Sequence, residues 1–183
     1  MEIVKSLKQT KIIKYLFIVL LGSILLAISA KIKIPFYPVP MTMQTFVVLF
    51  IGIAFGWKLG VSTVCLYLFE GIIGLPVFSG TPEKGLGIAY FTGPTMGYLI
   101  GFVVAAYLAG KFNYDNNLIK NFLKLVFATS FIYILGILWL GGIIGWDKPV
   151  FELGVQPFLL AELFKILIAT LVAVKIIKLR NIL

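Results

Sequence analysis

The 183-residue sequence has no histidine, a single cysteine and only seven acidic residues. Without histidine there is no imidazole base, no Ser-His-Asp triad and no histidine metal site. Cys65 stands alone in an apolar run, which excludes a disulfide framework and a thiolate zinc site and favours an apolar packing role. The P-loop pattern Gly-x-x-x-x-Gly-Lys-Ser/Thr is also absent. We therefore expect any ATP that drives the protein's function to be hydrolysed by another chain.

Charged residues are scarce as well. They make up 13% of the chain against 61% hydrophobic residues, and the mean hydropathy is +1.08. Soluble domains average about 25% charged and about 45–50% apolar residues. So little charge cannot cover the surface of a small soluble domain, which excludes a soluble enzyme, a nucleic-acid-binding protein and a disordered chain. We interpret the net charge of +9 as basic residues that flank membrane spans.

Long uncharged runs predict an all-α integral membrane protein with six transmembrane helices in a single domain, residues 1–183. The expected spans cover residues 15–30, 42–55, 59–71, 94–109, 125–145 and 158–175. Prolines at 35, 38 and 40 predict a rigid loop over residues 31–41 before the second helix. The first span resembles a signal peptide, but no small-residue cleavage site follows it, so we expect this helix to be retained.

The basic residues predict the orientation of these spans. With both termini cytoplasmic, eleven lysines and arginines fall on the cytoplasmic side and four fall in the outer loops, namely Lys31, Lys33, Lys84 and Lys148. This bias agrees with the excess of basic residues in cytoplasmic loops of membrane proteins. Five or seven spans would instead place the two basic termini on opposite faces.

Two segments on the expected outer side, residues 31–41 and 76–93, are rich in proline, glycine and aromatic residues rather than in charge. Their aromatic residues include Phe36, Tyr37, Phe78, Tyr90 and Phe91. We expect these loops to fold over the helices as a lid on an outward-facing cavity. The alternative is that they lie at the level of the lipid headgroups, where aromatic side chains are favoured.

Glu162 and Lys165 are two ionisable residues inside the last expected span. Each costs about 2.5–3.5 kcal/mol or more in a membrane and normally faces the protein interior. Their spacing of three residues places them on one helix face, together with Phe158 and Ala169. Such a face suits a small ligand with a polar neutral group, whose N–H donates to Glu162, and a carboxylate, which pairs with Lys165. The alternative is that the two residues only neutralise each other.

The sequence leaves two interpretations open for Glu70, for Gln44, and for Ser23 and Ala27 together. Glu70 is either a group in the pocket or a polar tie to a loop, and Gln44 bonds either a ligand or the folded proline loop. Ser23 and Ala27 form a small-residue face on the first helix. Such faces let membrane helices approach closely, so this one either docks a partner membrane protein or packs inside the bundle.

Three motifs in this order resemble the BioY family, the biotin-specific S components of energy-coupling-factor (ECF) transporters. They are Ile-Lys-Ile-Pro-Phe-Tyr-Pro-Val-Pro-Met-Thr-Met-Gln-Thr from Ile32, Glu-Gly-Ile-Ile-Gly-Leu-Pro-Val-Phe from Glu70, and Gly-Pro-Thr-Met-Gly-Tyr-Leu from Gly93. The resemblance implies the six-helix S-component fold, with biotin held near the outer side under the first and third loops. It also implies a bacterial inner-membrane location, a transmembrane coupling protein and two ATPase subunits as partners.

The resemblance also implies roles for individual residues. In this family an acid and a lysine of the last helix contact the vitamin, and Glu162 and Lys165 stand at those positions, although the family acid is often Asp after Gly. A third-loop Asn of some members is replaced here by a segment with Glu83 and Lys84, so Glu83, Lys84 or Tyr90 is left to make that contact. The expected substrate-binding set is Phe36, Tyr37, Gln44, Glu70, Phe78, Lys84, Tyr90, Tyr98, Glu162 and Lys165. Small residues of the first helix contact the coupling protein in this family, which favours that role for Ser23 and Ala27.

The sequence therefore predicts a transport protein that binds biotin and takes it up, and not an enzyme. No cofactor is expected, because biotin is the ligand and ATP is used by the partner subunits. A homo-oligomer is expected only if the protein acts alone. The alternatives are an S component for another vitamin, a membrane enzyme and a structural subunit.

Overall fold

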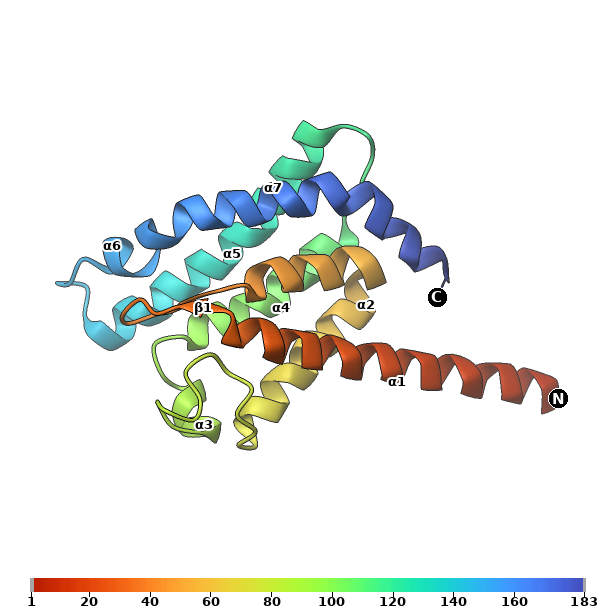
Figure 1. Ribbon diagram of the computed structural model, residues 1–183, viewed down its shortest axis with the longest axis horizontal. Helices are drawn as coiled ribbons and strands as arrows, with labels where there is room; N and C mark the ends of the chain where they lie inside the picture. The colour runs from red at the N-terminus through yellow and green to blue at the C-terminus, as the bar shows by residue number, and fades with distance from the viewer. Residues whose placement is uncertain (1, 183) are drawn as a thin grey trace.

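The computed structural model describes the backbone of residues 2–182 and the side chains of residues 11–180, and this part of the chain is mainly helical (Figure 1). Its long helices are α1 (Glu2–Lys31), α2 (Gln44–Ile72), α4 (Met96–Lys111), α5 (Leu118–Ile144) and α7 (Leu159–Ile176). Short helical segments are α3 (Gly87–Phe91), α6 (Val150–Gly154) and the 3₁₀ turns η1 (Gln156–Phe158) and η2 (Ile177–Ile182). The expected rigid loop over residues 31–41 contains a small antiparallel hairpin of β1 (Lys33–Ile34) and β2 (Met41–Thr42).

Helix α2 is interrupted at Gly56, where φ is 77° and ψ is 172°. Only glycine adopts this conformation readily, because a side chain would clash with the backbone. The interruption divides α2 into residues 44–55 and 57–72, so the expected spans 42–55 and 59–71 follow each other within one broken helix. Gly110 of α4 packs directly on this break, and a Cβ there would overlap the backbone of Trp57.

Among the described residues, three helical stretches are long and apolar enough to cross a membrane: Lys11–Lys31, Gln44–Ile72 and Leu118–Ile144. Helix α4 is a shorter apolar helix, and α7 carries three charged residues, Glu162, Lys165 and Lys175. The protein is therefore an all-helical membrane protein with at least these apolar helices. Cys65, expected to have an apolar packing role, is exposed on the surface of α2.

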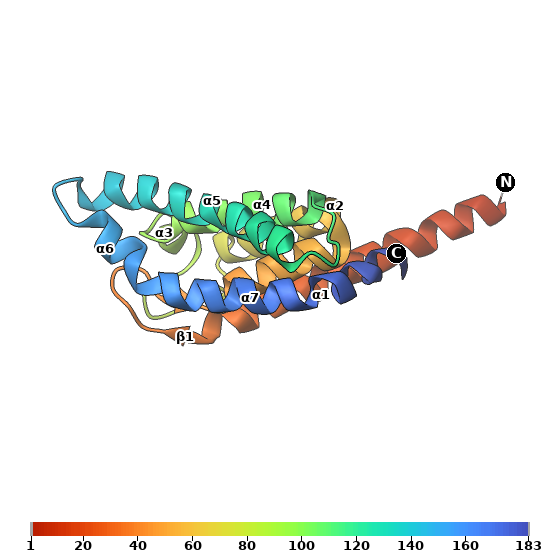
Figure 2. The same ribbon diagram turned by 90° about the horizontal axis from the view of Figure 1, so that it is seen from above.

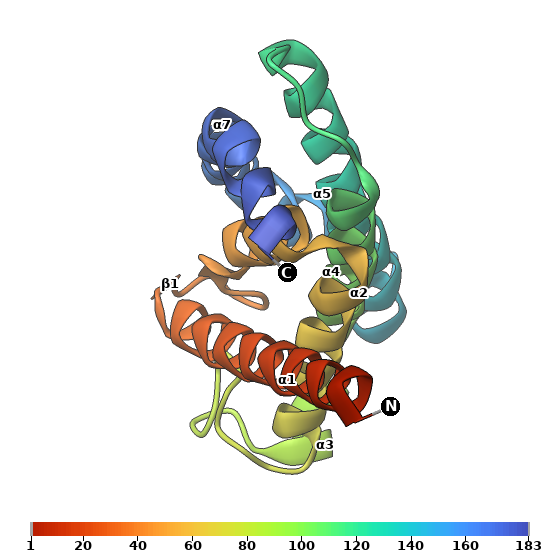
Figure 3. The same ribbon diagram turned by 90° about the vertical axis from the view of Figure 1, so that its right-hand side faces the viewer.

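The helices pack side by side along one long axis (Figures 1 and 2). Helix α2 contacts both α1 and α4, α4 contacts α5, and α7 lies against α2 and α5. Viewed along the axis, α2 separates α1 from α7 (Figure 3). The two chain ends lie at one end of the molecule, while the β1–β2 hairpin, α3 and α6 lie at the other (Figures 1 and 2).

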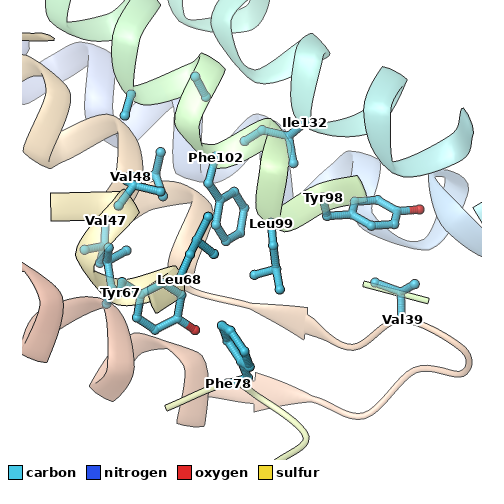
Figure 4. Packing of buried hydrophobic residues seen from close by; sticks show 14 of the residues in the cluster. Val39, Val47, Val48, Tyr67, Leu68, Phe78, Tyr98, Leu99, Phe102 and Ile132 are labelled. Atoms are coloured by element: carbon cyan, nitrogen blue, oxygen red, sulfur yellow. The ribbon is translucent and has the colours of Figure 1, made fainter. Parts of the chain in front are cut away.

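The larger buried cluster joins α2, α4 and α5 to the loops at the hairpin end (Figure 4). Tyr67 and Phe78 are its largest fully buried side chains, and Leu99 and Phe102 of α4 face them (Figure 4). Phe78 comes from the segment between α2 and α3, so its burial ties this segment to the helix core. The position of the loops is therefore set by the same packing as the position of the helices.

At the other end, Arg180 of η2 ties the chain end to two helices. Its guanidinium donates to the carbonyls of Ile53 (2.8 Å) and Gly52 (3.1 Å), and more weakly to those of Ala109 and Phe112 (both 3.4 Å). These carbonyls belong to the C-terminal turns of the first part of α2 and of α4, where helices lack internal donors and attract positive charge. The Tyr114 hydroxyl also donates to the Ala109 carbonyl, and burial raises the pKa of Tyr114, with Arg180 opposing that shift.

Candidate binding site

A cavity that is partly open to solvent, with about 520 Å³ of space between the surrounding atoms, lies among α2, α4, α5, α7 and the loops of the hairpin end. Its wall combines aromatic and apolar side chains with a few polar ones, as is typical of small-molecule sites. The lining residues are Val39, Pro40, Met41, Thr42, Gln44, Thr45, Phe78, Ser79, Tyr90, Thr95, Tyr98, Leu99, Phe102, Ile132, Tyr133, Phe158 and Glu162. Both proline- and glycine-rich loops thus contribute to the wall.

Glu162 and Lys165 form a buried ion pair at this cavity, with 5% and 6% of their surfaces exposed. Lys165 Nζ lies 2.6 Å from Glu162 Oε1. The same ammonium donates to the Thr42 carbonyl (2.6 Å) and to Thr45 Oγ1 (3.2 Å). A lysine ammonium has three protons to donate, so these three contacts use all of them. Lys165 therefore holds Glu162 and α2 in place, and it does not line the cavity.

Glu162 has one satisfied and one unsatisfied oxygen. Oε1 accepts from Lys165 and from Thr45 Oγ1 (2.8 Å), whereas Oε2 is buried without a hydrogen bond of good geometry, although the Tyr133 hydroxyl lies beside the carboxylate. A buried acceptor without a donor costs about 1–3 kcal/mol, and more when it is charged. Because Glu162 lines the cavity, a ligand with an N–H or O–H group could supply the missing donor. This carboxylate oxygen is the strongest recognition group of the site.

Gln44 occupies the cavity wall and is also tied to its surroundings. Its Nε2 donates to the Tyr67 hydroxyl (2.7 Å), and its Oε1 accepts from Thr42 Oγ1 (3.2 Å) in the proline loop. The Tyr67 hydroxyl in turn donates to the carbonyl of Val77 (3.2 Å). Gln44 therefore combines the two roles that the sequence left open, because it lines the cavity and anchors the loop.

Aromatic rings enclose the cavity on two sides. Phe78 stacks on Tyr90 with ring centres 5.3 Å apart and meets the edge of Tyr67 at 5.4 Å. On the other side, Tyr133 packs near both Tyr98 (6.1 Å) and Phe158 (6.3 Å). Gly71 leaves room for the Phe78 ring, which a Cβ at that position would overlap. A flat, largely apolar ligand fits between such rings.

Of the residues expected to bind substrate, Gln44, Phe78, Tyr90, Tyr98 and Glu162 line the cavity. The others lie elsewhere. Phe36 is outside it but contacts the lining residue Phe158 edge-on at 5.8 Å. Tyr37 is 85% exposed and does not line the cavity, and Lys165, which binds Glu162, does not line it either.

Lys84 lines a second cavity of about 330 Å³. This smaller cavity shares Pro40, Tyr90 and Thr95 with the main one, so the two adjoin each other. Its remaining lining residues are Pro38, Ala89, Gly93 and Pro94. Lys84 is exposed, and its ammonium is therefore placed at the outer edge of the combined space.

Glu70 is a tie between helices and not part of the cavity wall. It accepts a hydrogen bond from the hydroxyl of Ser23, which is fully buried between α1 and α2. Ala27 is half-buried and packs against the core on the same side. Of the two interpretations left open for Ser23 and Ala27, the structure shows packing for Ser23, whose small side chain lets α1 approach α2, and docking of a partner on the half-buried Ala27 stays a prediction. The exposed face of α1 consists of larger residues: Leu20, Leu21, Ile24, Leu25 and Ile28.

Sequence reasoning missed Thr45 and Tyr133. Thr45 follows Gln44 directly, but only the approach of α7, more than a hundred residues away, makes it a partner of Glu162. Tyr133 lies in the middle of an apolar run and carries no motif signal. Both are polar side chains within predicted spans, and that property alone could have marked them.

Comparison with known proteins identifies relatives along almost the whole chain. The probable biotin transporter BioY of Pyrococcus horikoshii is 35% identical over 153 residues, covering 81% of this chain and 87% of the relative. The biotin transporter BioY of Thermotoga maritima is 34% identical over 156 residues, covering 85% and 90%.

The fold is also that of a solved structure. It matches the crystal structure of the S-component for biotin from an ECF-type ABC transporter with a TM-score of 0.76, 24% identity and coverage of 92% and 93% of the two chains. The sequence model of the BioY family matches residues 4–181. The chain belongs to the BioY family.

Proposed function

We propose that this protein binds biotin in the main cavity and takes it up as the substrate-specific S component of an ECF transporter. One observation carries this proposal: in a chain of the BioY family, a buried carboxylate oxygen, Glu162 Oε2, has no hydrogen bond in the wall of a pocket lined by aromatic side chains. Biotin offers the complementary parts, which are a ureido group with two N–H donors, an apolar bicycle and a carboxylate.

The ureido end of biotin is assigned to Glu162. One ureido N–H donates to Oε2, and the bicycle lies between the Phe78 and Tyr133 sides of the cavity. Lys165 and Thr45 keep Glu162 oriented, since both bind its other oxygen. A ligand without such a donor leaves the carboxylate unsatisfied, so this contact also discriminates against other small apolar molecules.

The carboxylate of biotin is assigned to Lys84 and not to Lys165. Lys165 has no proton left to donate, whereas Lys84 lies in the smaller cavity that adjoins the main one. This revises the division of roles expected from the sequence, in which Lys165 paired with the carboxylate. An exposed lysine at the edge of the site attracts an anion without the cost of burying its charge.

We further propose six membrane crossings with both termini in the cytoplasm of a bacterial cell, in the inner membrane. The broken α2 supplies two of the crossings, and α1, α4, α5 and α7 supply the other four. Both chain ends lie at one end of the molecule, as an even number of crossings requires (Figure 2). The distribution of basic residues favours this end as the cytoplasmic one.

The proposed partners are a transmembrane coupling protein and two ATPase subunits, because the chain has no P-loop of its own. The exposed leucine and isoleucine face of α1 is the proposed contact with the coupling protein, next to the half-buried Ala27, while Ser23 is fully buried. A homo-oligomer is the form expected if the protein transports without these partners. No cofactor is required, since ATP would be consumed by the partners.

The direct test is calorimetric titration of the purified protein with biotin, with mass spectrometry of the small molecules that it releases. Biotin is expected to bind at one molecule per chain and to be recovered from the preparation. Thiamine, riboflavin and lipoate are expected not to displace labelled biotin. Displacement by one of them, or the recovery of a different vitamin, would assign the protein another substrate.

A further inference from the structure

Residues 78–81 form a part of the cavity wall that has no regular secondary structure. Phe78 and Ser79 of this segment line the cavity. On the side of α3, the Tyr90 hydroxyl accepts from the N–H of Gly80 (3.0 Å) and lies 3.2 Å from Ser79 Oγ. Because no helix or strand fixes the segment, its position depends on such side-chain contacts.

Two lysines hold the same segment from the side of α1. Lys31, the last residue of α1, donates from Nζ to the carbonyls of Phe78 and Thr81 (both 2.8 Å) and to Thr81 Oγ1 (3.3 Å). Lys33 of β1 donates from Nζ to the carbonyl of Ser79 (2.6 Å). Hydrogen bonds from an ammonium are stronger than those between neutral groups. Among the described side chains, neither lysine forms an ion pair, so both are committed to this backbone.

We propose that Lys31 and Lys33 form a latch that holds residues 78–81 closed over the cavity and controls the exchange of ligand. The inference rests on the proposed function, since it assigns the retention of biotin to the same cavity. Release of the latch loosens the backbone of Phe78 and Ser79 together, because the lysines bind the carbonyls of both residues, while the Phe78 ring still packs against the core.

The latch also connects the site to α1. Lys31 belongs to the rigid end of this helix, and Ser23, two turns earlier, is bonded to Glu70 of α2. A shift of α1 along or away from α2 therefore pulls on the carbonyls of Phe78 and Thr81. A protein that binds the exposed face of α1 would in this way act on the cavity wall without touching the ligand.

The test compares Lys31→Met with Lys31→Arg and with Lys148→Met as a matched control. Lys148 lies at the hairpin end as well, but its ammonium contacts only the exposed Asp147, at 3.7 Å. Association and dissociation of radiolabelled biotin are measured on the purified protein in lipid nanodiscs. For Lys31→Met, which removes all three hydrogen bonds from Nζ, we expect both rate constants to rise at least about tenfold, while Kd changes less than about threefold. Lys31→Arg restores slow exchange, and Lys148→Met leaves both rates unchanged.

Unchanged rates in Lys31→Met would overturn the latch. So would a weaker Kd that comes from faster dissociation alone, because it would indicate a contribution to the bound state and not to opening. Hydrogen exchange of the amides of residues 78–85, measured without biotin, gives a second readout. We expect faster exchange in Lys31→Met, and equal exchange would contradict the latch. A wild-type protein that binds no biotin would contradict the proposed function instead. The latch would still be tested in that case by comparing amide exchange in Lys31→Met and in the wild type.

Discussion

Glu162 and Lys165 lie one turn apart on α7 but have different environments. Lys165 is surrounded by acceptors from residues 42 and 45, whereas Glu162 keeps one oxygen unpaired at the cavity. The sequence shows that both charges are within a span and on one face, and this follows from helical spacing alone. It could not show which of them is free for a ligand, because the acceptors around Lys165 come from β2 and from the start of α2, more than a hundred residues away.

Replacing Glu162 with Gln tests the recognition group. The amide has almost the same shape, but it carries no charge and leaves Lys165 without its counter-ion. We expect the affinity for biotin to fall roughly 10- to 100-fold, which corresponds to one lost hydrogen bond to a charged group. Calorimetric titration measures the change. Glu152→Gln, on the exposed side of α6, is the matched control and is expected to bind as the wild type does. If Glu162→Gln binds biotin with the same affinity as the wild type, Glu162 is not a recognition group of the site.

Replacing Lys84 with Gln tests the carboxylate contact. Lys84 is exposed, so its pairing with an anion is expected to be weak, and the affinity for biotin should fall only about 2- to 5-fold. The affinity for biotinamide, which has a neutral carboxamide, should not change. If Lys84→Gln weakens the binding of biotin and of biotinamide by the same factor, Lys84 acts on the loop and not on the carboxylate of biotin.

At the scale of elements, the broken helix α2 decides how the site is assembled. Its first part carries Gln44 and Thr45 to the cavity, and its second part carries Tyr67 and Gly71 to the aromatic cluster around Phe78. The sequence predicts two apolar spans, 42–55 and 59–71, and the structure places the break between them, at Gly56. A single glycine in an apolar run does not by itself predict a positive φ, which depends here on the packing of α4 against the break.

Gly56→Ala is therefore expected to destabilise the protein by about 1–3 kcal/mol, the cost of holding a side chain in a backbone region that only glycine adopts readily. Space is not the cause, because the nearest atom to a Cβ there is Arg180 Nε at 3.8 Å. Gly142→Ala in α5 is the control, since a Cβ at that position meets nothing within 4 Å and the backbone there is helical. Thermal unfolding in detergent compares the two. A melting temperature for Gly56→Ala equal to that of the control would show that the break does not require glycine.

At the scale of the whole molecule, the end with the hairpin, α3 and α6 holds the cavity, and the opposite end holds both termini (Figure 1). The sequence predicts this separation well, because the loops rich in proline and aromatic residues all fall on the side with few basic residues. It predicts the contacts between α1 and its neighbours less well. Small residues on a helix indicate close packing, but they do not indicate which neighbour packs there, and in this protein it is α2.

Cysteine labelling tests the orientation of the whole molecule. In a Cys65→Ala background, Lys148→Cys is expected to react with a membrane-impermeant maleimide in intact cells. Lys120→Cys, at the start of α5, should react only after the membrane is made permeable. Both lysines are exposed, so the difference reports the side of the membrane and not burial. Labelling of Lys120→Cys in intact cells would show that the start of α5 faces the outside, and the protein would then have the opposite orientation.

The central claim is that an unpaired oxygen of Glu162 awaits an N–H of the ligand inside the aromatic cavity. An experimental structure of the biotin complex tests it most directly. We predict a ureido nitrogen at hydrogen-bond distance from Glu162 Oε2, roughly 2.7–3.2 Å, with the carboxylate directed toward Lys84. Biotin bound in the opposite orientation, with its carboxylate on Lys165 and its ureido group at the outer edge of the cavity, would contradict the account.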